Sequence, residues 1–153
     1  MKRVIGMLAL LLALCVLTAC GQNAAPLNGV VEFYDISLNI PADYARNTEK
    51  SGEDMWVFDK GSDDRDIVIS CNAVEGEAET MLDNYVQYMQ SLQTDSNRTT
   101  VSGCNGVRTS YTQDGVLCQE MLFIYKDTVY TIALRGDTQA TFDAILATVT
   151  AGG

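Results

Sequence analysis

Four aspartates form the densest acidic cluster of the sequence, within the polar stretch DKGSDDRD. They are Asp59, Asp63, Asp64 and Asp66. Several carboxylates close together are the ligands that a hard cation such as Ca²⁺ prefers. The spacing does not fit an EF-hand loop, however, and Lys60 and Arg65 partly neutralise the cluster. We therefore interpret the stretch as a solvated loop between strands and keep a divalent-cation site at these aspartates as the alternative.

Catalytic residues are harder to assign, because the sequence contains no histidine. That removes the commonest general base and the commonest metal ligand of proteins. Ser102 and Ser110 consequently have no partner for a Ser-His-Asp triad, and no cysteine or histidine spacing favours zinc. We predict that the protein is not an enzyme and that it holds no cofactor beyond any covalently attached lipid.

Two aromatic side chains are the best candidates for contacts with a partner. Tyr44 follows Pro41, which ends a predicted strand, and Trp56 belongs to a short strand that could form a sheet edge. Aromatic side chains at such spacing more often belong to the core, but exposed ones are frequent anchors of interfaces. We expect Tyr44 and Trp56 to be exposed and to be the residues that contact a partner.

The five cysteines divide into a pair near the N-terminus, Cys15 and Cys20, and three later ones, Cys71, Cys104 and Cys118. Three thiols leave at least one unpaired. Cys118 should face about Ser110 or Tyr111 across a hairpin, so a bridge from Cys104 to Cys118 would be out of register. We expect buried free thiols and keep a Cys71–Cys118 disulfide as the alternative, because sequence does not fix which strands are neighbours.

The N-terminus has the pattern of a secretory signal peptide. Lys2 and Arg3 form a positive start, and residues 4–17 are an apolar run shorter than the roughly 20 residues of a membrane span. Without this leader, eight basic residues face 20 acidic ones, a formal charge of −12. Such a surface repels phosphate groups, so nucleic acid is not an expected partner.

The end of the leader, Leu17-Thr18-Ala19-Cys20-Gly21, resembles the lipobox of bacterial lipoproteins. Small residues precede Cys20 where a protease must enter, whereas Leu14 precedes Cys15. The resemblance implies cleavage between Ala19 and Cys20 and a diacylglyceryl thioether on Cys20. Two acyl chains anchor a protein stably, so the membrane would be a partner through the lipid alone.

The expected location is the extracytoplasmic face of a bacterial membrane. This is the cell membrane in a Gram-positive cell. In a two-membrane cell the outer membrane is expected by resemblance, because Gly21 is not the aspartate that signals retention.

We predict that the chain consists of a leader, a tether and one domain. Residues 1–19 form the predicted signal peptide, residues 20–30 a small, polar, flexible tether, and residues 31–153 a single α+β domain. Alternating or apolar runs predict strands over 33–40, 55–58, 67–74, 98–101, 107–112, 116–125 and 128–135. Helical spacing predicts helices over 77–92 and from Asp137 or Thr138 to about residue 149.

The last two strands carry apolar side chains on both faces. In a two-residue turn, Phe123 faces Tyr130 and Met121 faces Ile132, while Leu122 and its neighbours point to the opposite face. Both faces must then be covered, which favours an antiparallel sheet flanked by helices.

The stretch DISLNIPADY, the turn GCNGV, the strand VYTIALRG and the closing helix resemble the PsbP/Mog1-like domains in order and spacing, over about residues 31–149. The resemblance implies an α-β-α sandwich and a tendency to bind proteins, with no catalytic residues to carry over. We therefore expect a membrane-tethered, non-enzymatic accessory module for a protein or envelope component, with a small-molecule or divalent-cation binder as the alternative.

Overall fold

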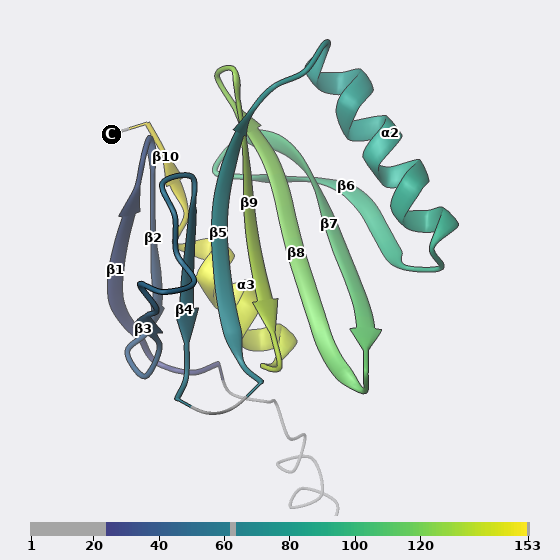
Figure 1. The fold of residues 1–153 in the computed structure, drawn as a ribbon. Helices are drawn as coiled ribbons and strands as arrows, with labels where there is room; N and C mark the ends of the chain where they lie inside the picture. Colours follow the sequence, from purple (N-terminus) through teal and green to yellow (C-terminus); the bar gives the residue numbers. More distant parts are fainter. Residues whose placement is uncertain (1–23, 62–63, 153) are drawn as a thin grey trace, which may run out of the picture.

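The computed structural model describes residues 24–61 and 64–152, and two antiparallel sheets dominate it (Figure 1). The larger sheet has the strand order β3-β4-β5-β9-β8-β7-β6, and the smaller has the order β1-β2-β10. The elements are β1 Leu27–Phe33, β2 Ile36–Pro41, β3 Ala45–Arg46, β4 Met55–Asp59, β5 Asp66–Ala73, α2 Ala78–Ser91, β6 Asp95–Val101, β7 Cys104–Gln113, β8 Val116–Tyr125, β9 Thr128–Arg135, α3 Gln139–Ala147 and β10 Thr150–Ala151.

The β8–β9 hairpin lies in the middle of the large sheet, and its predicted register is confirmed. Phe123 pairs with Tyr130 and Met121 with Ile132. The rings of Phe123 and Tyr130 stack with their centroids 5.6 Å apart. Because strand side chains alternate between faces, this register also sends Leu122 and Val129 to the opposite side.

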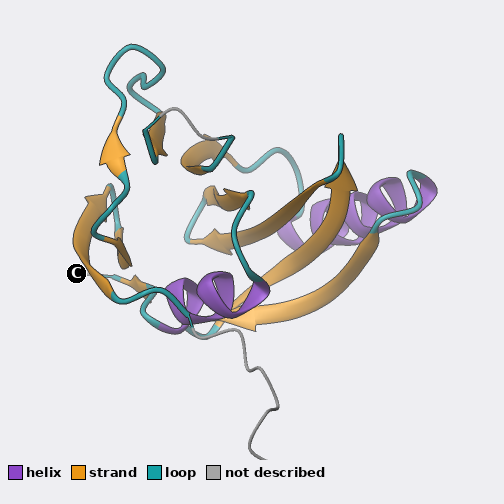
Figure 2. Cartoon of the chain, turned by 90° about the horizontal axis from the view of Figure 1, so that it is seen from below, coloured by secondary structure: helices purple, strands orange, loops and turns teal. Residues whose placement is uncertain are grey.

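Each face of the large sheet has its own apolar core. On one face, Phe123 and Ile132 pack with Phe33 of β1 and Phe142 of α3. On the other face, Leu122 and Val129 form a smaller cluster with Leu82 of α2. In Figure 2, α3 lies beside the small sheet and α2 lies well away from it. The predicted α+β class, an antiparallel sheet with cover on both faces, is confirmed.

Both predicted helices are present. α2 begins after Glu77, as the spacing of its apolar residues predicts, and buries Leu82 and Met89. α3 begins after Thr138, whose hydroxyl accepts a hydrogen bond from the backbone N–H of Thr141 at 3.1 Å. This side-chain cap satisfies one of the N–H groups that a helix start leaves unpaired.

The first predicted strand, over 33–40, is wrong as a single strand, because the chain turns inside it: β1 ends at Phe33 and β2 begins at Ile36. Tyr34 adopts φ 53° and, with Asp35, closes a tight hairpin between β1 and β2. Asp35 fits the alternation of a strand, so the turn was hidden in the pattern. β1 begins at Leu27, within the segment 20–30 expected to be tether, because Leu27, Gly29 and Val30 pair with β2.

Two further strands begin earlier in the sequence than predicted. β6 begins at Asp95, inside the predicted loop 94–97, and β7 begins at Cys104 rather than at residue 107. Ser102 and Gly103 both have positive φ and connect the two strands in a two-residue turn. The predicted strand over 98–101 is the second half of β6, and the first half was missed because it lies on an edge strand with mostly exposed, polar side chains.

None of the helices within residues 24–61 and 64–152 has the length and apolar character needed to cross a bilayer.

Gly106 is the position where the sheet tolerates no side chain. A Cβ there would meet the backbone oxygen of Leu122 and would lie 2.8 Å from the Cβ of Phe123. We predict that Gly106→Ala lowers the free energy of unfolding by about 3 kcal/mol, since overpacking forces the backbone to move. Urea unfolding measures this loss.

Gly52→Ala is the matched control, because a Cβ at Gly52 meets nothing within 4 Å. It should change stability by less than about 0.5 kcal/mol. Equal effects of the two substitutions would contradict the close packing of β7 on β8.

Candidate functional site

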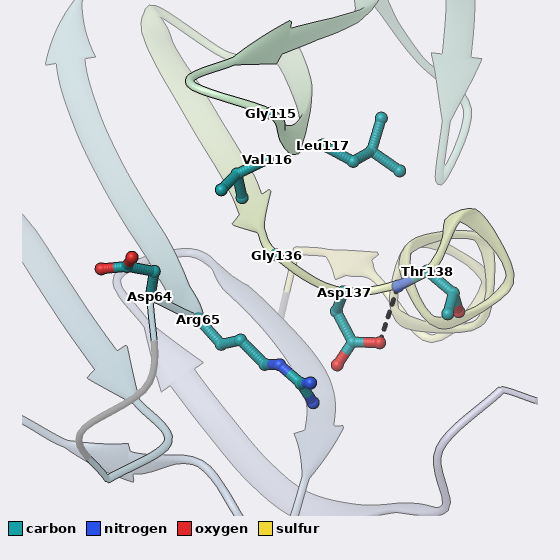
Figure 3. Close-up of a pocket in the computed structure, with 8 residues that line it drawn as sticks. All are labelled: Asp64, Arg65, Gly115, Val116, Leu117, Gly136, Asp137 and Thr138. Atoms are coloured by element: carbon teal, nitrogen blue, oxygen red, sulfur yellow. Dashed lines mark hydrogen bonds between the residues drawn. The ribbon is translucent and has the colours of Figure 1, made fainter.

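Three loops that are distant in sequence meet at one end of the large sheet and enclose an open cleft of about 580 Å³. Asp64 and Arg65 come from the β4–β5 loop, Val116 and Leu117 from the start of β8, and Gly136 from the turn that leads into α3 (Figure 3). Gly136 has φ +76°, and a Cβ there would lie 2.7 Å from the backbone oxygen of Asp64. The turn into α3 therefore packs directly against the acidic loop.

Asp137 lines this cleft, but its carboxylate is already engaged. One oxygen accepts the backbone N–H of Thr138 at 2.7 Å and the hydroxyl of Thr141 at 3.1 Å. The other oxygen accepts the hydroxyl of Tyr44 at 3.1 Å. Asp137 thus fixes the start of α3, and its oxygens are used by the fold rather than offered to a cation.

Tyr44 is buried, so the expectation that it is an exposed partner contact is wrong. Its side chain belongs to the core cluster and is only 6% exposed. The chain turns after Pro41 and brings the ring inward, since the backbone N–H of Tyr44 bonds the carbonyl of Pro41 at 3.2 Å. Burial, with the negative charge of Asp137, raises the pKa of Tyr44 well above its usual value.

Trp56 is half-buried, and its ring already has partners. The ring of Phe33 lies edge-on with the centroids 5.1 Å apart, and the guanidinium of Arg46 lies 3.8 Å from the Trp56 ring centroid. A cation over an aromatic face is an attractive contact. A partner that stacked on this face of Trp56 would have to displace Arg46.

The four aspartates of the acidic cluster do not converge on one site, and those that the structure describes have different partners. Asp63 lies outside the described residues. Asp59 accepts Asn47 Nδ2 at 2.7 Å and Lys50 Nζ at 3.2 Å, which lowers the pKa of its carboxyl. Asp66 pairs with Arg135 across β5 and β9, and burial raises its pKa. Among the described residues, no three acidic or cysteine side chains lie close enough together to hold a metal ion.

All three described cysteines are free thiols. The register places Cys118 opposite Tyr111, as predicted. Cys71 pairs with Tyr130 on β9, so β9 separates it from β8 and from Cys118. The alternative Cys71–Cys118 disulfide is therefore wrong. Cys71 and Cys118 are buried, as expected, whereas Cys104 is only half-buried, because the turn that follows β6 leaves it near the surface.

Sequence reasoning missed a second group of polar residues on the face that α3 covers. Arg108 of β7 and Gln119 of β8 lie next to a separate cavity together with Ser110. The signal was present, because Gln119 and Glu120 interrupt the otherwise apolar run VLCQEMLFIY of β8. A buried amide in the middle of a sheet requires a structural or binding role.

Comparison with known proteins adds information on the fold. No protein-family model matches the sequence, and a search of curated proteins finds no relative. Solved structures do match. Cyanobacterial PsbP (CyanoP) from Synechocystis sp. PCC 6803 superposes with a TM-score of 0.58 at 10% identity, covering 88% of this chain and 97% of that one.

Two other structures are similar. LpqN, described as involved in cell envelope biogenesis of Mycobacterium tuberculosis, has a TM-score of 0.50 at 15% identity over 86% of this chain and 94% of its own. A protein from Bacteroides thetaiotaomicron VPI-5482 has a TM-score of 0.53 at 13% identity over 84% of this chain. The present chain spans 49% of that protein's length. The chain has a PsbP-like fold.

The bond from Tyr44 to Asp137 yields a stability prediction. Tyr44→Phe removes the hydroxyl but keeps the buried ring, so it should lower the free energy of unfolding by about 1.5–3 kcal/mol, the usual loss for a hydrogen bond to a charged group. Denaturant unfolding measures the loss. Tyr34→Phe is the control, because the Tyr34 hydroxyl bonds Asp54 at an exposed position. If Tyr34→Phe were the more damaging change, the role given to Asp137 would be wrong.

Asp59 and Asp66 should affect stability with opposite dependence on pH. A raised pKa in the fold disfavours the charged form of Asp66, so its stabilising contribution is present below about pH 4 and is lost as pH rises through the folded pKa. Asp66→Asn should therefore increase the free energy of unfolding at pH 7, by less than about 1 kcal/mol after solvent screening, and should have less effect at pH 3.

The lowered pKa of Asp59 has the opposite consequence, because its contribution is present above about pH 4 and is lost as pH falls. Asp59→Asn should destabilise at pH 7 and have less effect at pH 3. Thermal unfolding of both variants at the two pH values checks the signs, and equal signs at pH 7 would contradict the assignment.

Proposed function

We propose that the protein is a lipid-anchored, extracytoplasmic binding module that is not an enzyme. The observation that carries this proposal is the sequence Leu17-Thr18-Ala19-Cys20, placed directly after a positively charged and apolar leader. Cys20 and Ala19 lie outside the described residues, so the proposal on cleavage and lipidation rests on the motif. In it, residues 1–19 are removed, and Cys20 carries the lipid.

The fold supports a short tether at one end of the domain. The backbone N–H of Ala25 donates to the hydroxyl of Thr141 at 3.4 Å, so the chain joins the domain beside the start of α3. The five chain steps from Cys20 to Ala25 span at most about 18 Å. The α3 end, with the cleft of Asp64 and Asp137, would then lie near the membrane surface.

The opposite end of the sheet would be the part most accessible to a partner. β5 runs from Asp66 near the first cleft to Ala73 at the far end. There Tyr34, Asp54, Cys71 and Asp127 line another open cleft, of about 550 Å³. In Figure 1 the β8–β9 turn lies at the top of the sheet, and the β7–β8 turn lies at the bottom.

The titrating groups favour binding over catalysis. A nucleophilic cysteine needs a lowered pKa, but burial raises the pKa of Cys71, of Cys104 and of Cys118. The hydrogen bond to Asp54 raises the pKa of Tyr34 to about 12, which opposes its use as a base at neutral pH. These groups are poorly suited to acid-base or nucleophilic chemistry.

The similar structures are consistent with an accessory role at the cell envelope. LpqN is described as involved in cell envelope biogenesis of Mycobacterium tuberculosis. At 15% identity the likeness concerns the fold, so the role itself is our proposal for this chain. A small-molecule ligand is the second candidate, favoured by the open clefts. For a divalent cation, the described residues offer no cluster of ligands.

Cys20→Ala tests the anchor. Without the thiol there is no site for the diacylglyceryl group, so at least about tenfold more protein should appear in the soluble fraction after cell fractionation, since two acyl chains provide the membrane affinity. Cys15→Ala is the matched control, because it changes the other leader cysteine, and it should leave the protein in the membrane fraction.

Incorporation of radioactive palmitate gives an independent readout. The wild type and Cys15→Ala should be labelled, and Cys20→Ala should not. Labelled, membrane-bound Cys20→Ala would sink the assignment of the lipid to Cys20.

A further inference from the structure

β1 is an edge strand of the small sheet and has β2 as its one neighbour there, because the strand order is β1-β2-β10. The other sheet edges that the structure describes differ from it. β3 and β10 have two residues each, and every exposed side chain of β6 is polar or charged. β1 instead exposes Val30, whose exposed fraction of 72% is the highest among the large apolar side chains described. An open edge with an exposed apolar side chain is a template for an added strand.

The backbone groups of Val30 and Glu32 point away from β2. Val30 lies opposite Asn39, but the backbone N–H of Asn39 donates to the hydroxyl of Thr148 at 2.8 Å, so this pair does not exchange hydrogen bonds. Bonded and unbonded pairs alternate along an antiparallel ladder, so Glu32 and Ser37, two residues further on, form an unbonded pair as well. Val30 and Glu32 therefore offer their N–H and C=O groups to a further strand.

An open pocket of about 310 Å³ lies at the turn end of this edge. Glu32 of β1, Ser37 of β2 and Thr150 of β10 lie opposite one another, so their side chains share the outer face of the small sheet. The pocket continues over the β1–β2 turn, where Tyr34 and Asp35 line it. A strand added to β1 would place one side chain beside Glu32 on this face, next to the pocket.

The charges at the pocket favour a basic side chain. The charged residues that line it and the adjoining far-end cleft are all aspartate or glutamate. Glu32 forms no ion pair among the described residues. Asp35 pairs with Lys126 at 3.2 Å, but both side chains are more than half exposed, so water screens this pair. The ring of Tyr34 is 59% exposed, and a cation can lie over it.

We propose that β1 binds an extended, basic segment of a partner protein by strand addition. The segment runs antiparallel to β1 and carries an apolar side chain opposite Val30. Two residues earlier in the segment, an arginine or lysine lies opposite Glu32, and its charged end occupies the pocket at Tyr34 and Asp35. The recognised pattern is thus a basic residue, any residue and an apolar residue.

This inference rests on the proposed binding role and gives the chemistry of the partner, but it does not depend on lipidation of Cys20. Tyr34 and Asp35 line the far-end cleft as well as this pocket. The site therefore lies at the end of the domain that the proposed tether leaves most accessible.

The probe is a peptide of sequence TRTVT, acetylated at its N-terminus and amidated at its C-terminus. It is titrated to millimolar concentration into the ¹⁵N-labelled full chain held in detergent. The backbone N–H signals of Val30 and Glu32 should shift as the peptide is added. The peptide TETVT places a second carboxylate opposite Glu32, so it should bind at least about fivefold more weakly.

Methylation of peptide nitrogens separates strand addition from charge attraction. In the proposed pairing, the N–H groups of the peptide's arginine and valine point at β1, and that of the central threonine points away. A methyl group on the arginine nitrogen removes a donor and blocks the edge, so it should weaken binding at least about tenfold. The same methyl group on the central threonine nitrogen is the matched control and should leave the affinity within about twofold.

Glu32→Gln tests the charge from the side of the protein. Because Glu32 is exposed and unpaired, the melting temperature should not change, while TRTVT should bind about threefold more weakly and TETVT more tightly than to the wild type. Glu75→Gln is the matched control, since Glu75 is exposed in the loop before α2, and it should bind both peptides as the wild type does.

The proposal is overturned if millimolar TRTVT shifts neither the Val30 nor the Glu32 signal, or if the two methylated peptides bind equally well. It is also overturned if the chain alone forms a dimer in sedimentation and the same two signals shift with protein concentration, because a second copy would then occupy the edge. Each result can occur while Cys20→Ala releases the protein from the membrane as expected, so failure here is distinguishable from failure of the proposed function.

Discussion

The fold depends on the need to bury both faces of β8 and β9. Neighbouring side chains on a strand point to opposite faces, so Phe123 and Leu122 require cover on opposite sides of the same sheet. α2 covers Leu122 with Leu82, whereas α3 and β1 cover Phe123 with Phe142 and Phe33. The N-terminal hairpin and the C-terminal helix are thereby brought together on one face, although they lie at opposite ends of the domain's sequence.

This shared layer also places the sites of interest around α3. Asp137 and Thr138 fix the start of the helix, and Tyr44 reaches the same carboxylate from the segment after β2. Ala25 joins the domain at the first turn of α3, next to Thr141. The polar cavity next to Arg108 and Gln119 lies beside the same helix, so the point of chain entry and this cavity share one supporting element.

Strongly patterned elements were predictable from sequence, whereas edge elements were predicted only in part or not at all. The register of Phe123 with Tyr130 followed from an apolar alternation and a two-residue turn, and α2 followed from helical spacing. β6 is mostly exposed and polar, so its first half, residues 95–97, carries no hydrophobic period and was missed. The turn at Tyr34 was concealed because Asp35 continued the alternation. Both errors concern backbone pairing that side-chain type alone does not encode.

The candidate sites also divide into features that residue type reveals and features that depend on packing. The acidic stretch was visible in the sequence as a cluster. Whether each carboxylate is free depends on residues outside the cluster, however: Asn47, for example, donates a hydrogen bond to Asp59. Tyr44 was misplaced because burial of an aromatic ring after a turn depends on the packing of α3. Gln119 had a visible signal, a polar residue in an apolar strand, but only the structure shows that it is buried and that no described residue bonds its Nε2.

The proposed function requires that Cys20 be the first residue of the mature protein and carry its membrane anchor. Mass spectrometry of the intact protein extracted from bacterial membranes tests this most directly. We expect a chain that begins at Cys20, lacks residues 1–19 and has the added mass of a diacylglyceryl group on its N-terminal residue. A chain that retains the leader, or one that begins at Cys20 without added lipid mass, would contradict it.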